Sequence, residues 1–220
     1  MPFRQPSPQL IIFGFLLLIV VVMIQIEVIT LVLTKLGLSS GSASLLLVTT
    51  FLGSMINLPL GRITSDFHFD ENNPLHRSFM PYRFIDSSTL IAVNVGGGLI
   101  PILFSTYLLS TTQVNVLFVI VATVIISILS YLFSRPVANL GIGMPLFVAP
   151  VAAAILAMLM SKDNAPALAY ISGSLGVLIG ADLLRIKDIR HLNAPIAAIG
   201  GAGTFDGIFM TGIIAVLLTH

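Results

Sequence analysis

The last apolar stretch of the chain runs from Ala194 to Leu218 and reads APIAAIGGAGTFDGIFMTGIIAVLL. It is long enough to cross a bilayer, which takes about 20 predominantly apolar residues per helix. Asp206 lies near its middle, and a carboxylate at that depth costs on the order of 3 kcal/mol on insertion scales. Because charged residues rarely occupy such positions without a task, Asp206 is the first candidate for a functional site.

The composition of the whole chain is that of a membrane protein. Of its 220 residues, 56% are hydrophobic and 9% are charged, whereas soluble domains carry about a quarter charged residues. The net charge of +1 gives no electrostatic reason to expect a nucleic-acid partner. The absence of cysteine excludes disulfides, thiol catalysis and Cys-based metal sites. We therefore expect the lipid bilayer to be the main partner, and the sequence leaves the oligomeric state open.

Seven apolar stretches predict an all-α, polytopic membrane protein with one transmembrane domain over residues 1–220. The predicted spans are 9–34, 41–60, 88–110, 112–134, 140–160, 165–184 and 194–218, with a long polar loop at 61–87. Of the ten Lys and Arg residues, this arrangement puts Lys35 and Lys162 on one side and the other eight on the side of the N-terminus. Positive charge accumulates on the cytoplasmic side. We therefore expect a cytoplasmic-membrane protein with its N-terminus inside and its C-terminus outside.

Two pairs of predicted spans resemble each other in sequence. Residues 52–63 match residues 175–186 without a gap, and residues 91–98 match residues 196–203 with one gap. Two parallel three-helix units joined by the fourth span, a 3+1+3 pseudo-repeat, would explain both matches, and parallel repeats build some small transporters. Chance similarity between apolar helices explains the matches equally well.

Glycine clusters interrupt the third and seventh predicted spans, each beside a polar residue. Such interruptions in corresponding spans are typical of transporter sites, because unwound backbone offers polar groups to a substrate. Close packing of helices on small residues is the alternative explanation. The leading hypothesis is a transporter or permease of a small solute or ion, with a proton or cation site at Asp206. The predicted binding residues are Asp206, Asn94, Gly97, Gly201, Gly203 and Thr204.

Asp182, near the cytoplasmic end of the sixth predicted span, supports a second hypothesis. Two carboxylates that share a proton can act on water as base and acid, so Asp182 and Asp206 would form a diaspartyl intramembrane hydrolase. The glycines before both residues loosely resemble those of intramembrane aspartyl proteases, but the Gly-x-Gly-Asp motif of those enzymes is absent. On straight helices the two carboxylates would differ in depth by about 10 Å or more. Only a broken seventh span would bring them together, and an ion pair with Arg185 is the alternative role of Asp182.

A third hypothesis is a non-catalytic membrane assembly partner, which predicts a dry, packed interior with Asp206 hydrogen-bonded. The polar loop contains His68, Asp70, Glu71 and His76. These residues lack the fixed spacing of known metal sites. We therefore expect no metal site in this loop. We also expect no cofactor.

Four segments resemble an uncharacterised family of bacterial and archaeal polytopic membrane proteins that is defined only as a domain of unknown function. The segments are Asn94–Pro101, Gly141–Pro145, Gly180–Leu184 and Gly200–Phe209. The resemblance covers most of the chain from the third predicted span onward and is most specific at Gly-Thr-Phe-Asp-Gly-Ile-Phe. It implies an integral membrane protein of one domain in a prokaryote, and it implies no activity.

Overall fold

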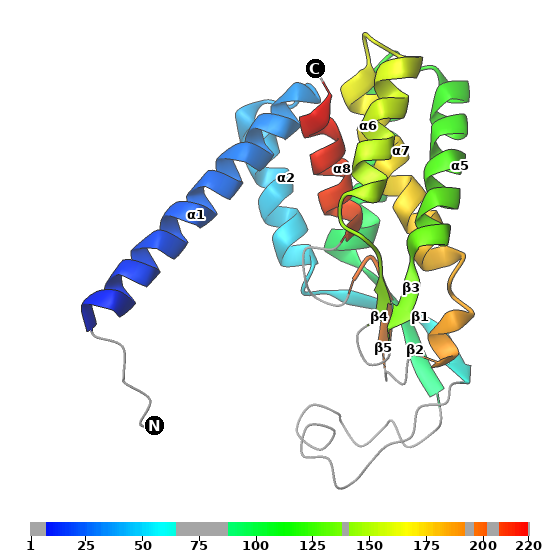
Figure 1. Ribbon diagram of the computed structural model, residues 1–220, viewed down its shortest axis with the longest axis horizontal. Coiled ribbons are helices and arrows are strands. Elements are labelled where there is room, and N and C mark those ends of the chain that lie inside the picture. Colours follow the sequence, from blue (N-terminus) through cyan, green and yellow to red (C-terminus); the bar gives the residue numbers. More distant parts are fainter. Residues whose placement is uncertain (1–7, 65–87, 138–140, 192–195, 202–206, 220) are drawn as a thin grey trace, which may run out of the picture. The chain divides into compact units, whose positions relative to one another are not determined.

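The structure is a computed structural model of the chain that describes residues 8–64, 88–137, 141–191, 196–201 and 207–219. The chain divides into two compact units, Met1–Leu47 and Val48–His220. Helices predominate in both, and the strands all belong to the second unit (Figure 1).

The first unit consists of one long helix, a turn and the beginning of a second helix. Helix α1 spans Pro8–Lys35, and its segment Phe15–Lys35 is long and apolar enough to cross a membrane. The chain then turns through Gly37, whose φ of +88° is in the region that favours glycine. Helix α2 (Ser40–Gly53) follows, and the hydroxyl of Ser39 accepts the N–H of Ser42 at 3.2 Å. This bond satisfies one of the donors that a helix start leaves open.

The second unit is a bundle of helices arranged around α7 (Ala165–Val177). Helices α4 (Ile100–Thr111), α5 (Val116–Phe133), α6 (Val148–Met160) and α8 (Gly207–Leu218) all contact α7. The most apolar window of the α7 segment is 72% buried, against 33% for α5, so α7 forms the core of the bundle. Short π-helical turns follow β2 and α7: η1 (Val95–Leu99) and η2 (Leu178–Leu183).

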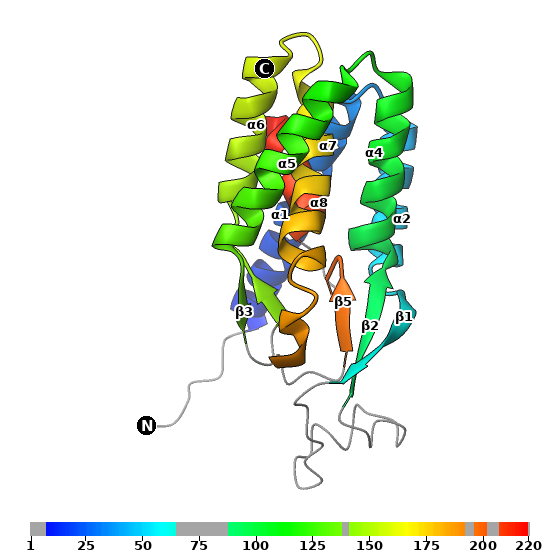
Figure 2. The ribbon, with the colours of Figure 1, turned by 90° about the vertical axis from the view of Figure 1, so that its right-hand side faces the viewer.

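Two small sheets lie at one end of this bundle (Figures 1 and 2). The larger has the strand order β1-β2-β5, with β1 at Asn57–Thr64, β2 at Ser88–Asn94 and β5 at Ile196–Ile199. β1 and β2 are antiparallel, with Asn57 opposite Asn94, whereas β2 and β5 are parallel, with Leu90 opposite Ile196. The smaller sheet is the antiparallel pair β3 (Arg135–Val137) and β4 (Gly141–Gly143). A 3-10 turn, η3 (Asp188–His191), follows η2.

The prediction of a mainly helical chain is confirmed, but the prediction that it contains helices alone is wrong. The stretches predicted as spans 41–60, 88–110, 140–160 and 194–218 each combine a short helix with strand residues. The loop predicted at 61–87 begins inside β1, and its residues 65–87 lie outside the described residues. Among the described residues, three helices are long and apolar enough to cross a membrane: Phe15–Lys35, Val116–Phe133 and Ala165–Leu183. An apolar run of about 20 residues therefore does not always correspond to one helix here.

The arrangement of the seventh predicted span matters most for function. β5 ends at Ile199, Gly200 and Gly201 turn the chain, and α8 begins only at Gly207. The third predicted span has the same order of strand, glycine segment and helix, in β2, η1 and α4. Both interruptions coincide with the glycine clusters identified in the sequence.

Candidate functional site

Asn94 is an internal hydrogen-bonding centre at the end of β2. Its side chain is fully buried. Its Nδ2 donates to the carbonyl oxygen of Ser54 at 2.7 Å and to Oδ1 of Asn57 at 3.0 Å. Its Oδ1 accepts the N–H of Gly97 at 2.8 Å, which caps η1. Both amide hydrogens of Asn94 are therefore used, one to join β2 to Ser54, the residue after α2, and one to join it to Asn57, the first residue of β1.

The two glycine segments pack directly on each other. Since β2 and β5 run parallel, the residues that follow them lie side by side. Gly200 has a φ of +83°, and a Cβ there would meet the carbonyl carbon of Gly97 and the Cα of Gly98 at 2.7 Å each, and would collide with the nitrogen of Gly98. Such an approach admits only glycine. Gly97 is buried in this contact, and Gly201, also at positive φ, is half-buried.

Asp182 contacts the second of these glycine segments at Gly200. It lies in η2, and its Oδ2 accepts the N–H of Gly200 at 2.8 Å. The two residues are 18 positions apart in the sequence. A carboxylate that accepts a backbone N–H makes a charge-assisted bond, which is stronger than a neutral one. Asp182 thus lies at the turn where the seventh predicted span is interrupted.

Asp206, Gly203 and Thr204 lie outside the described residues, so their predicted roles stay predictions. Asp206 directly precedes Gly207, the first residue of α8. The residues that follow it, Ile208 and Phe209, are buried. In the sequence, only six residues, 201–206, separate Gly200, which contacts Asp182, from the first residue of α8.

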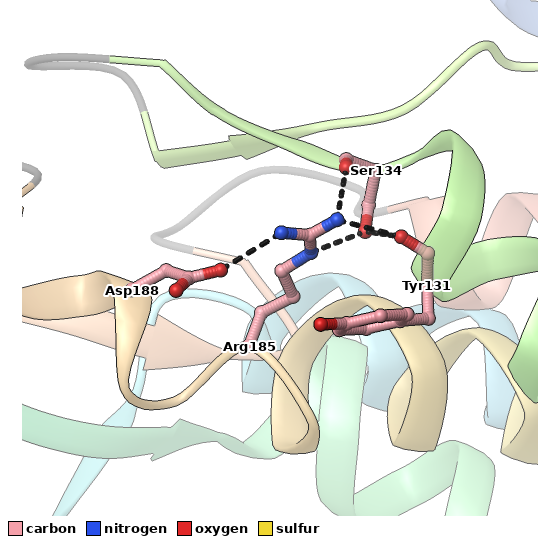
Figure 3. A network of polar contacts seen from close by, with 4 residues as sticks. All are labelled: Tyr131, Ser134, Arg185 and Asp188. Atoms are coloured by element: carbon pink, nitrogen blue, oxygen red, sulfur yellow. Dashed lines mark hydrogen bonds and ion pairs between the residues drawn. The ribbon is translucent and has the colours of Figure 1, made fainter.

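Arg185 forms the centre of a polar network next to this site, and the sequence did not reveal its partners (Figure 3). Its Nε donates to Oγ of Ser134 at 3.1 Å, and its Nη2 donates to the carbonyl oxygens of Tyr131 and Ser134 at 2.7 Å each. Its Nη1 forms a salt bridge with Asp188 at 2.9 Å. The guanidinium carbon lies 4.4 Å from the centre of the Tyr131 ring. Arg185 is thus ion-paired with Asp188, three positions later in the sequence.

The described residues hold no group of three or more His, Asp or Glu side chains that could bind a metal. The loop residues His68, Asp70, Glu71 and His76 lie outside the described residues. The chemistry that the described site offers is that of a carboxylate held against a glycine turn in an apolar bundle.

These features define a mainly helical protein with apolar helices of membrane-spanning length and a carboxylate at a chain interruption. A family model described as "Protein of unknown function (DUF1614)" matches residues 51–218, and the chain belongs to this family. The match begins at residue 51, whereas the resemblance noted in the sequence began only in the third predicted span. No curated protein and no solved structure matches the chain.

Proposed function

We propose that the protein is a polytopic membrane hydrolase that uses Asp182 and Asp206 as a pair of carboxylates. The observation that carries the proposal is the hydrogen bond from Gly200 N–H to Asp182 Oδ2. The strongest objection to this function was the difference in depth between the two residues on straight helices. That objection loses its basis, because the seventh apolar stretch is interrupted between β5 and α8.

The chemistry requires one ionised and one protonated carboxylate near the same bond. The ionised group takes a proton from water as the water oxygen attacks the carbonyl carbon of an amide. The protonated group gives its proton to the carbonyl oxygen, and the tetrahedral intermediate then loses the amine after the nitrogen is protonated. The carbon–nitrogen bond breaks, and the products are a carboxylic acid and an amine. Two nearby carboxylates share one proton readily because both cannot ionise at close range.

We infer the membrane orientation from the distribution of basic residues. Arg62 in β1, Arg135 in β3 and the pair Arg185 and Lys187 after η2 belong to the end of the bundle that carries the sheets, whereas Lys162 lies in the turn between α6 and α7 at the other end (Figure 1). Basic residues favour the cytoplasmic side. The sheets and Asp182 would then face the cytoplasm, and cleavage would occur near that surface.

The permease hypothesis is the second candidate, and one observation favours it. The glycine interruptions of the third and seventh predicted spans touch, as the two halves of a 3+1+3 pseudo-repeat would do at a transport site. Against it, the amide hydrogens of Asn94 and the N–H of Gly97 already have protein partners. The packed glycines also fit the third hypothesis, a non-catalytic assembly partner, which requires no open site.

A cleavage assay separates these functions. The protein is reconstituted in liposomes with a library of internally quenched apolar peptides of about 20 residues, the length of one span. We expect cleavage by the unchanged protein and none by Asp182→Asn or Asp206→Asn, while Asp163→Asn, in the turn between α6 and α7, retains it. Absence of cleavage by the unchanged protein, or its persistence in both Asn variants, rejects the hydrolase. Cation or proton flux that requires Asp206 but not Asp182 would support the permease.

A further inference from the structure

Arg185 connects the segment that bears Asp182 to the end of α5. Its side chain is 17% exposed, and three of its nitrogens donate hydrogen bonds to Ser134, Tyr131 and Asp188. Two of the acceptors are carbonyl oxygens at the C-terminus of α5, where helix carbonyls lack partners within the helix. A cation is favoured at this end by the helix dipole. The planar guanidinium, stacked on the Tyr131 ring, matches these acceptors in a way that a lysine ammonium does not.

A second contact with α5 lies on the other side of Asp182 in the sequence. A Cβ at Gly180 would collide with the carbonyl oxygen of Ser127 and would lie 2.8 Å from the Cβ of Ser130. The backbone of η2 therefore rests directly on α5 at Gly180. Asp182 lies between these two attachments in the sequence, and its Oδ2 accepts the N–H of Gly200, the residue that follows β5.

We propose that Arg185 is a positioning residue, which holds η2 on the end of α5 and thereby directs the Asp182 carboxylate to the Gly200 turn. A catalytic role for the Asp182 carboxylate rests on the proposed function, whereas its positioning by Arg185 does not. An ordinary stabilising role for Arg185 would lower the free energy of unfolding and leave the Asp182–Gly200 contact of the folded protein unchanged.

The amide of Gly200 reports on this contact without any substrate. The protein in detergent micelles is labelled with ¹⁵N in its 18 glycines and with ¹³C in the isoleucine carbonyls, which selects Gly200 among the few glycines that follow isoleucine. Asp182→Asn identifies the Gly200 resonance. In Arg185→Gln we expect this resonance to move and its amide to exchange about tenfold faster, because a hydrogen bond to a charged group is weakened. The matched control is Arg135→Gln, an exposed arginine at the same end of the bundle, which leaves Gly200 unchanged.

A second variant covers the case in which Arg185→Gln does not fold. Ser134→Ala removes one acceptor of Arg185 and retains both carbonyl acceptors, so it moves the Gly200 resonance in the same direction by less. A Gly200 amide that stays at its original position and exchange rate in the folded variants overturns the proposal. In the cleavage assay, Arg185→Gln lowers kcat and leaves KM unchanged. If Asp182→Asn retains cleavage while Arg185→Gln still moves Gly200, the hydrolase fails and the positioning role stands.

Discussion

Gly200→Ala tests the contact between the two glycine segments, because it adds a single methyl group at the point of closest approach. Two effects act on this variant. A φ of +83° costs a residue with a Cβ about 1–2 kcal/mol. The methyl group also meets the backbone of Gly97 and Gly98 at 2.7 Å, which is far inside ordinary contact distance. Overpacking of this kind costs typically 1–3 kcal/mol.

The conformational entropy of the unfolded chain partly offsets these costs, since alanine reduces it by about 0.4–1 kcal/mol. We therefore expect Gly200→Ala to lower the free energy of unfolding by about 2–4 kcal/mol. Gly37→Ala provides the matched control, because Gly37 has a similar φ of +88° and no atom within 4 Å of an added Cβ. That variant carries the backbone term alone, so we expect a loss of about 1 kcal/mol or less.

Both free energies are measured by unfolding in mixed detergent micelles, followed by circular dichroism. The difference between the two variants isolates the collision at Gly97 and Gly98. If Gly200→Ala is no more destabilising than Gly37→Ala, the glycine segments do not pack as described, and the Gly200 turn does not lie where it would contact Asp182.

Three further predictions concern single side chains. Asn94→Ala leaves three partners without their hydrogen bonds, and two of them, Ser54 and Gly97, are buried, so we expect a loss of about 3 kcal/mol in the same assay. Asn115→Ala removes an exposed cap of α5 and should lose only about 1 kcal/mol, and equal losses would contradict the role of Asn94. Asp188→Asn breaks a partly exposed salt bridge and should lower stability by at most about 1 kcal/mol, less at high salt; a salt-independent loss above about 2 kcal/mol would refute this. Gly41→Ala, in α2 with open space around it, should raise the unfolding midpoint, and a lower midpoint would show that the site is not open.

The composition indicated a membrane protein. The sequence also predicted the mainly helical character and the places where the third and seventh predicted spans are interrupted. It did not predict the strands, since Leu90–Val93 is apolar on both faces and a short apolar run of this kind reads equally well as helix. Two prolines were informative signals. Pro101 lies in the first turn of α4, where proline is favoured. Pro59 lies in β1, and a continuous helix over the second predicted span would not tolerate a proline at this position.

The candidate site was predictable only in part. The sequence predicted Asn94 and the glycines as binding residues, and that role stays a prediction. The hydrogen bond of Asn94 to Ser54 joins segments 40 residues apart, and no local pattern encodes it. The Arg185 network was missed for the same reason, since Arg185 and Ser134 are 51 positions apart. The sequence suggested two partners for Asp182, Asp206 in a catalytic pair and Arg185 in an ion pair, but it did not suggest Gly200, whose N–H the Oδ2 of Asp182 accepts. Long-range contacts of this kind depend on the packing of α5, α7 and β5.

The central claim is that the carboxylates of residues 182 and 206 meet, and the chain is suited to a direct test because it contains no cysteine. The measurement is the yield of intramolecular disulfide in Asp182→Cys/Asp206→Cys under mild oxidation in liposomes. Two cysteines form a bridge only when their Cα atoms lie within about 7 Å. We expect rapid, nearly complete bridging, and none in Asp163→Cys/Asp206→Cys, whose first position lies beyond the far end of α7. A yield for the 182/206 pair no higher than that of the control would contradict the account.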